Sequence, residues 1–248
     1  RHYYDDGDHV WEDQVDSLLS EFGYTVRADG KRTAVDESVY DGISTKTTRV
    51  DWVYDNIGRL VQEDYDADGT DLDFTADYLF DLVGNRLEKT VDRGRDAIVD
   101  EIFSYEYDLN DRLLTETLDH QLDNTQDRYT EYGYDNTQQT SKTVHAGADA
   151  NAPVVESHDY TFNLQGRMDS AEVSRYDSGA TTLEQHERET YEYDDSGIRA
   201  AKTVEVDVNT DGDFDDAGTD TTARTDYHVD KQNHTGYAQV LEEMQGDV

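Results

Sequence analysis

Residues 52–60 are Trp52-Val53-Tyr54-Asp55-Asn56-Ile57-Gly58-Arg59-Leu60, and variants of this phrase recur along the chain. The shared order is aromatic, any residue, aromatic, Asp, two variable residues, Gly, Arg and Leu. The second aromatic falls at positions 54, 80, 107, 134, 162 and 193, so the intervals are 26, 27, 27, 28 and 31 residues. A fixed period of this size indicates a repeat architecture, in which each unit buries its surface against its neighbours.

Each copy of the phrase predicts a strand, a tight turn and a returning strand. Two aromatics separated by one residue lie on the same face of a strand, because side chains alternate. The Asp that follows can bond its own backbone two residues on, and Gly accepts a positive φ, so the middle of the phrase predicts a turn. A lone hairpin is marginal in water. We therefore expect an all-β chain, with antiparallel hairpin repeats forming one long curved sheet.

The motif positions are interpreted as structural. We expect the aromatics to pack across strands, the Asp to hold the turn, and the Arg to pair with a neighbouring repeat's Asp or to stack on its Tyr. The alternative is that the tyrosines form a stacking platform for sugars. The motif residues are Tyr54, Asp55, Gly58, Arg59, Phe80, Asp81, Arg86, Tyr107, Asp108, Arg112, Tyr134, Asp135, Phe162, Gly166, Arg167, Tyr193, Asp194, Gly197 and Arg199.

The repeats divide the chain into three parts. Residues 1–16 form an N-terminal lead-in, and residues 17–229 contain about seven repeats of 26–34 residues, the first a weak copy around Tyr24. Residues 230–248 are predicted to be a terminal strand leading to a core segment that lies beyond this sequence. Because the chain begins at Arg1 in mid-pattern, we expect it to be a piece of a longer polypeptide.

The composition is strongly acidic. There are 59 acidic and 21 basic residues, with a formal net charge of −38. Nucleic acid is excluded as a partner, because neutralising phosphates requires clustered Lys and Arg, and no apolar run is long enough for membrane insertion. The hydrophobic content of 34% is low, but 18 tyrosines supply large rings, and the absence of cysteine excludes disulfides and thiolate chemistry.

The recurring phrase resembles the YD repeats of the rearrangement-hotspot (Rhs) family, which also occur in insecticidal toxin-complex proteins and in animal teneurins. The resemblance covers about residues 17–243. It implies that the repeats spiral into a β-shell enclosing their own chain or a C-terminal toxin, so that the partner is the remainder of the same polypeptide. We therefore expect a structural segment of an extracellular or cell-surface bacterial shell. The alternative is an adhesion module that binds carbohydrate or another surface.

One loop has the spacing of a calcium site. Asp207, Asn209 and Asp211 occupy positions one, three and five, Gly212 position six and Asp215 position nine. This order places hard oxygen ligands around a tight turn that glycine permits. Position twelve, usually a bidentate Glu, is Gly218. We expect Asp215 or Asp216 to supply the ligand in its place. A weaker candidate, with the same beginning, comprises Asp64, Asp66 and Asp68.

Enzymatic motifs are poor in this sequence. The eight histidines include no H-E-x-x-H pair, and there is no G-x-S-x-G elbow. Carboxylate pairs carry no information where 59 acidic residues are present. We predict that the chain is not an enzyme and requires no cofactor, with Ca²⁺ as the one candidate ligand. Acidic turns that bind no metal are the competing interpretation of both loops.

Overall fold

The computed structural model describes residues 2–4, 17–67, 73–120, 126–216, 219–230 and 239–247, and every structural statement below refers to these residues. They form 17 strands and no helix, so none of them belongs to a helix that could span a membrane. The strands are β1 (His2–Tyr4), β2 (Ser17–Val26), β3 (Arg32–Tyr40), β4 (Thr45–Tyr54), β5 (Leu60–Ala67), β6 (Phe74–Phe80), β7 (Arg86–Arg93), β8 (Glu101–Tyr107), β9 (Leu113–His120), β10 (Arg128–Asp135), β11 (Gln138–His145), β12 (Val154–Phe162), β13 (Met168–Tyr176), β14 (Leu183–Tyr193), β15 (Arg199–Asp207), β16 (Thr221–Asp230) and β17 (Gln239–Asp247).

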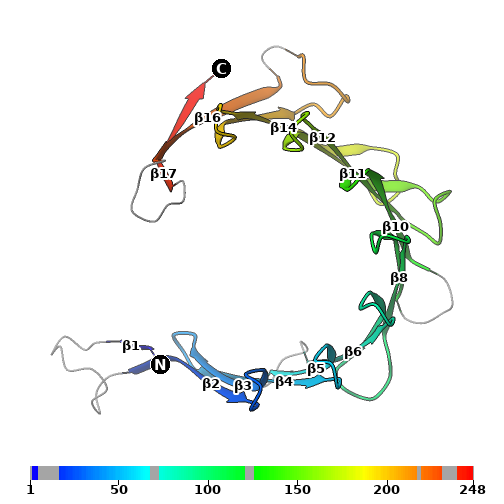
Figure 1. The fold of residues 1–248 in the computed structure, drawn as a ribbon, viewed down its shortest axis with the longest axis vertical. Coiled ribbons are helices and arrows are strands. Elements are labelled where there is room, and N and C mark those ends of the chain that lie inside the picture. Colours follow the sequence, from blue (N-terminus) through cyan, green and yellow to red (C-terminus); the bar gives the residue numbers. More distant parts are fainter. Residues whose placement is uncertain are drawn as a thin grey trace. The chain divides into compact units, whose positions relative to one another are not determined.

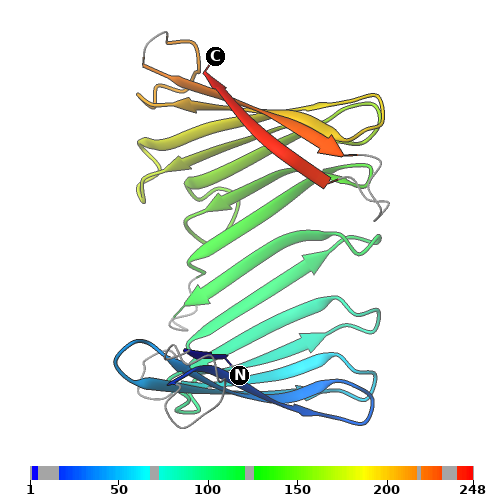
Figure 2. The ribbon, with the colours of Figure 1, turned by 90° about the vertical axis from the view of Figure 1, so that its left-hand side faces the viewer.

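The chain divides into two compact units. The first contains residues 1–106 and 118–125, and the second contains residues 107–117 and 126–248. In the first unit each strand from β1 to β8 pairs antiparallel with the next strand in sequence. In the second unit the same holds from β10 to β17. Within each unit the sheet bends along the order of its strands (Figure 1), and long hairpins succeed one another (Figure 2). The predicted all-β fold of antiparallel hairpins in a curved sheet is confirmed.

A β-bulge lies beside the second aromatic of the motif. The register of the first clear copy shows it: Val53 faces Gln62 but Tyr54 faces Leu60, so Val61 is the extra residue. The same shift falls between Leu79 and Phe80, Gly133 and Tyr134, Thr161 and Phe162, and Glu192 and Tyr193. Bulges increase local twist and redirect side chains. The bulges of these five copies therefore add local twist at the turn ends of their hairpins.

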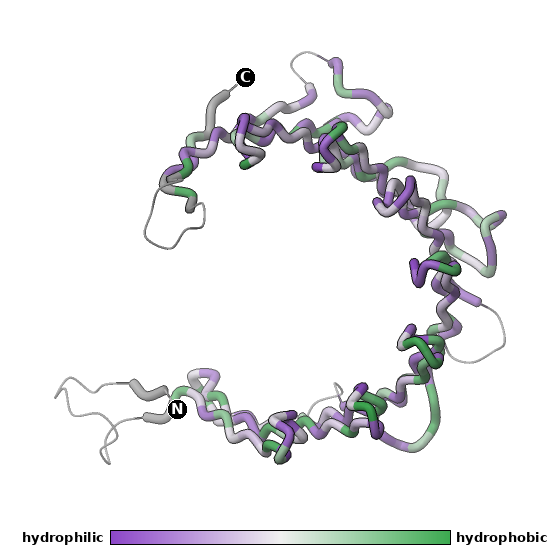
Figure 3. The backbone as a smooth tube through the Cα atoms, in the orientation of Figure 1, coloured by the Kyte–Doolittle hydropathy of each residue, from purple (hydrophilic) through white to green (hydrophobic). Residues whose placement is uncertain are grey.

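Small residues dominate the buried part of each sheet. The buried apolar residues are Ala34, Val35, Val50, Ala67, Ala76, Val91, Tyr105, Val144 and Ala201. Polar and apolar residues are mixed along the strands (Figure 3), and charged pairs such as Arg188 Nε with Glu205 Oε2, 2.8 Å apart, cross between neighbouring strands. Cross-strand pairs on a sheet face each contribute roughly 0.2–1 kcal/mol. Stability is therefore spread over many small contacts.

Candidate functional sites: the motif turns and an acidic loop

The motif Asp organises the turn that follows it. Asp55 Oδ1 accepts hydrogen bonds from the amides of Ile57, at 3.1 Å, and Arg59, at 2.8 Å. The Asp55 amide donates to the Arg59 carbonyl at 2.9 Å, which closes the turn, and Gly58 takes the positive φ of 89° that the turn requires. Equivalent bonds are made by the side chains of Asp81, Asp108, Asn163 and Asp194.

The motif Arg reinforces the same turn. Arg59 Nε lies 2.7 Å from Asp55 Oδ2. The pKa of Asp55 is lowered most by the hydrogen bond from this guanidinium, and next by the hydrogen bond from the Arg59 amide. In the repeat centred on Tyr107, the Arg112 amide and then its side chain lower the pKa of Asp108 in the same way. Both turns are therefore built on ionised carboxylates.

The same arginines also reach the next repeat. Arg59 Nη1 donates to the Asp81 carbonyl at 2.7 Å, and the guanidinium lies 4.9 Å from the centre of the Phe80 ring. Arg112 likewise donates to the carbonyl of Asn136 and lies 4.9 Å from the centre of the Tyr134 ring. We call this contact, from the motif cation of one repeat to the aromatic and turn carbonyl of the next, the inter-repeat clasp.

The tyrosine of the next repeat completes the clasp in the opposite direction. The Tyr134 hydroxyl donates to the Leu113 carbonyl at 2.9 Å, just past the turn that Arg112 ends. The Tyr54 and Tyr193 hydroxyls donate to the Arg32 carbonyl, at 2.9 Å, and the Met168 carbonyl, at 2.8 Å. Phe80 and Phe162 have no hydroxyl to make this bond, so the clasp is one-directional in those repeats.

In two copies another residue stands at the position of the motif arginine. Lys31 Nζ donates to the Gly58 carbonyl at 2.9 Å and lies 5.3 Å from the centre of the Tyr54 ring. Gln138 Nε2 donates to the Gly166 carbonyl at 2.7 Å. Both belong to degenerate copies of the motif, so the sequence pattern alone does not predict their role. A search for any long donor at the end of each turn would find them.

Two motif arginines depart from the pattern. The Arg86 guanidinium lies 5.9 Å from the centre of the Tyr78 ring and 4.5 Å from that of Tyr105. Arg199 stacks on Tyr191 of its own repeat at 4.2 Å. In the copy that carries Arg86, the extra residue Asn85 occupies the turn position, and its amide Nδ2 bonds Asp81 Oδ2 at 3.1 Å.

As the pH is lowered, the chain should associate before it unfolds. Asp55, Asp108 and Asp177 have folded-state pKa values below their ordinary 3.8. A carboxylate with a depressed folded pKa stabilises the fold above its unfolded pKa, and that stability is lost as the pH falls through the folded value. Between pH 7.5 and about 4.5 the turns should hold, while the net charge that opposes pairing of exposed strand edges shrinks.

The measurement is light scattering together with far-UV circular dichroism across the pH range. We expect scattering to rise towards the sequence pI of 4.2 with the β spectrum intact, and the spectrum to be lost only below about pH 3.8. Loss of β structure already at pH 4.5, or a monomer at every pH, would contradict this account.

The acidic loop between β15 and β16 gathers carboxylates. Asp207 is the last residue of β15, and its side chain is completely buried. Carboxylate oxygens of Asp211, Asp213 and Asp216 all lie within 4.8 Å of one another. Asp215, the ligand proposed from spacing, is outside this group and exposed, whereas Asp213 and Asp216 converge. Position twelve of the calcium pattern, residue 218, lies outside the described residues.

The weaker acidic candidate is arranged differently. Asp64 and Asp66 lie in β5 and not in a loop. Arg95 bridges them, with Nε 2.9 Å from Asp64 Oδ1 and Nη1 2.6 Å from Asp66 Oδ2. Asp68 lies outside the described residues. The guanidinium already supplies the positive charge between these two carboxylates, so this region carries no metal proposal.

The fold is shared with solved structures. A crystal structure of TcdB2-TccC3-TEV matches 95% of this chain with a TM-score of 0.54 and 12% sequence identity. This chain therefore shares its fold with the matched part of that structure. It spans 13% of the length of that protein, so the whole protein's activity and partners are not carried over.

Two other solved structures are more distant. TcdB2-TccC3 without its hypervariable C-terminal region matches 87% of this chain and 12% of its own length, with a TM-score of 0.46 and 14% identity. A porin-like protein from Bacteroides uniformis matches 92% of this chain and 88% of its own length, with a TM-score of 0.38 and 12% identity. No family model and no curated protein matches the sequence.

Proposed function

We propose that this chain forms part of the wall of an extracellular bacterial Rhs/YD-repeat shell. The shell would enclose or present another part of the same polypeptide, such as a C-terminal toxin. The observation that carries the proposal is the fold shared with TcdB2-TccC3-TEV over 95% of the chain. A wall segment must hold its shape by contacts between successive hairpins, and it needs no convergent catalytic centre.

The inter-repeat clasp supports this role. Arg59 and Arg112 each bond a carbonyl of the following repeat and stack on its aromatic ring. A cation over an aromatic ring is worth about 0.5–1 kcal/mol at an exposed site. Such contacts recur along the direction in which the repeats are added, so they stiffen the sheet against bending between hairpins.

Protease protection in the complete gene product that carries this chain tests the proposal. We expect the segment that follows the repeats to resist cleavage while the wall is intact. The double variant Arg59→Ala, Arg112→Ala should expose it, whereas Asp195→Asn, a change at an exposed turn residue, should not. If the segment is cleaved equally fast in all three proteins, the wall encloses nothing.

Carbohydrate binding is the second candidate, favoured by one observation. A polar hollow of about 570 Å³ lies between two motif turns and is lined by Asn163, Gln165, Glu192 and Tyr193, among others. Amide and carboxylate groups beside a ring are suited to sugars. However, the Tyr193 hydroxyl is bonded to a backbone carbonyl, and the Arg167 guanidinium lies 5.6 Å from the ring centre, over one face.

A glycan array separates the two candidates. Signal above background that is lost in the Glu192→Ala variant would favour a binding module. We expect no binding, because the arginine occupies one face of the ring that a sugar would need.

A further inference from the structure

We propose that the β15–β16 loop is a calcium site built from Asp207, Asn209, Asp211, Asp213 and Asp216. The first three occupy positions one, three and five of a calcium loop, with Gly212 at position six. Gly212 has a φ of 99°, the conformation that the sharp turn of such a loop demands. This site is independent of the proposed wall function.

The strongest indication of a ligand is the buried carboxylate of Asp207. Its side chain has no exposed surface. Oδ2 accepts a hydrogen bond from the Gly212 amide at 2.9 Å and lies 3.2 Å from His186 Nδ1. The other oxygen, Oδ1, is buried and has no hydrogen-bond partner. A buried carboxylate oxygen without a hydrogen-bond donor is costly, and coordination of a metal ion is one of the ways in which proteins satisfy such a group.

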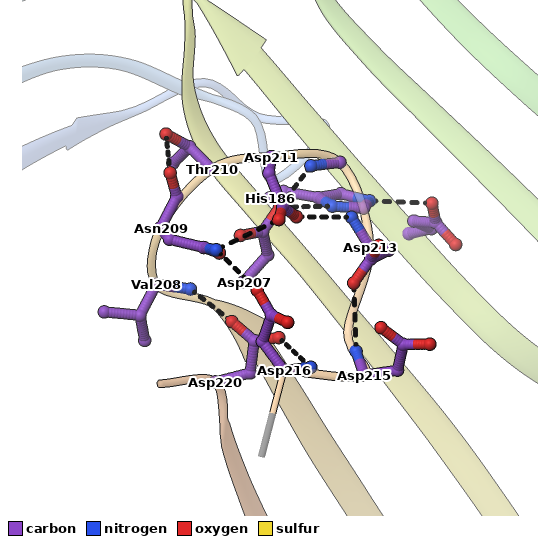
Figure 4. A network of polar contacts seen from close by, with 12 residues as sticks. His186, Asp207, Val208, Asn209, Thr210, Asp211, Asp213, Asp215, Asp216 and Asp220 are labelled. Carbon is purple, nitrogen blue, oxygen red and sulfur yellow. Dashed lines mark hydrogen bonds and ion pairs between the residues drawn. The ribbon is translucent and has the colours of Figure 1, made fainter. Parts of the chain in front are cut away.

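The remaining candidate ligands lie on the loop that follows Asp207. Figure 4 shows the Asp207 side chain enclosed by the loop that runs from Val208 to Asp216. Carboxylate oxygens of Asp211, Asp213 and Asp216 lie within 4.8 Å of one another. The carboxylates therefore repel one another, and a divalent ion would remove that repulsion.

The side-chain amide of Asn209 stands where a cation would act. Its Nδ2 donates to Asp211 Oδ2 at 3.0 Å and to Asp216 Oδ2 at 2.7 Å, so it bridges two like charges (Figure 4). With an ion between these carboxylates the amide would turn and present its oxygen, the atom that position three supplies in calcium loops.

The loop is held in place by groups outside the site. Asp220 accepts hydrogen bonds from the amides of Val208, at 3.1 Å, and Asp216, at 3.0 Å, which closes the base of the loop. Phe214 packs with its ring centre 4.2 Å from that of His186 and with the Arg188 guanidinium 4.5 Å away. The carboxylates are therefore brought together without the ion.

The chemistry of these groups selects calcium. All the candidate ligand atoms are oxygens, as hard cations prefer. The two ring nitrogens of His186 are engaged by Asp207 and Glu172, so the site offers no nitrogen ligand of the kind that favours zinc. Calcium also accepts an irregular arrangement of oxygens such as this loop offers, whereas magnesium demands close octahedral geometry.

Calorimetric titration of the chain with CaCl₂, at an ionic strength that screens non-specific binding, tests the site. We expect one site with a Kd of about 10⁻⁴–10⁻³ M, the range of extracellular modules. The melting temperature should rise with calcium and rise less with magnesium. The Asp211→Asn variant, changed on an exposed loop residue, should bind at least about tenfold more weakly.

The matched control is Asp195→Asn, which removes the same charge from an exposed turn in the same unit and should leave the affinity unchanged. Circular dichroism verifies that both variants fold. The proposal is overturned by any of three results: no heat and no thermal shift with about 10 mM calcium, equal affinity in the two variants, or equal stabilisation by magnesium.

Discussion

Replacing Gly197 with alanine should lower the free energy of unfolding by about 2–3 kcal/mol, measured by chemical denaturation followed by circular dichroism. Gly197 has a φ of 80°, where a side chain costs about 1–2 kcal/mol. A Cβ there would lie 2.0 Å from Arg167 Nη2 and 2.3 Å from its Cζ. The guanidinium would have to leave the Tyr193 ring, so the variant loses this cation–ring contact as well as the relaxed backbone.

Gly84→Ala is the control for this prediction. Gly84 occupies the same motif position with a φ of 111°, but nothing lies within 4 Å of its added Cβ. It should show the backbone strain alone, about 1–2 kcal/mol. The double variant Arg167→Ala, Gly197→Ala should lose less unfolding free energy than the sum of the losses in the two single variants, because its alanine at position 197 no longer meets the arginine. Equal losses in Gly84→Ala and Gly197→Ala would refute the clash.

Arg112→Met should cost about 2 kcal/mol of unfolding free energy. The guanidinium bonds Asp108 in its own turn and the Asn136 carbonyl in the next, and it lies 4.9 Å from the centre of the Tyr134 ring. Methionine keeps the apolar stem but loses all three interactions. The pKa of Asp108 should also rise towards its ordinary value, because part of its depression comes from the Arg112 side chain.

A double-mutant cycle with Tyr134→Leu isolates the clasp. We expect a coupling free energy of about 1 kcal/mol between Arg112 and Tyr134. The control Arg175→Met removes an arginine, 44% exposed, that pairs with Glu156 on the neighbouring strand, and it should cost no more than about 1 kcal/mol. Zero coupling in the cycle, or equal losses of unfolding free energy in Arg112→Met and Arg175→Met, would mean that the two turns are not joined through Arg112.

The sequence predicts the hairpins well, because their signals are local. Alternating aromatics, an Asp and a glycine decide strand and turn within nine residues. β4 ends at Tyr54 and β5 begins at Leu60, as the phrase predicts. The bulge beside each second aromatic could not be foreseen, because it depends on which residue of the returning strand is left unpaired. The roles of Lys31 and Gln138 are likewise set by the neighbouring turn.

The acidic loops show the same limit. Spacing along the chain predicts Asp207, Asn209, Asp211 and Asp215 as ligands, with Asp216 as a substitute. The fold brings carboxylate oxygens of Asp211, Asp213 and Asp216 together, and spacing alone does not single out Asp213. The contact of Phe214 with His186, and the bridge from Arg95 to Asp64, join residues 28 and 31 positions apart in sequence. Such pairings follow from strand register, which local patterns leave open.

The direction of the clasp has a consequence for biosynthesis. Because Arg59 bonds a carbonyl and a ring that lie more than twenty residues further along the chain, a nascent hairpin is completed only when its successor has left the ribosome. At about 5–20 residues per second, one repeat of 26–31 residues takes roughly 1–6 s to be made. During that interval the newest strand edge is open, and translation speed sets how long each growing end is exposed to wrong partners.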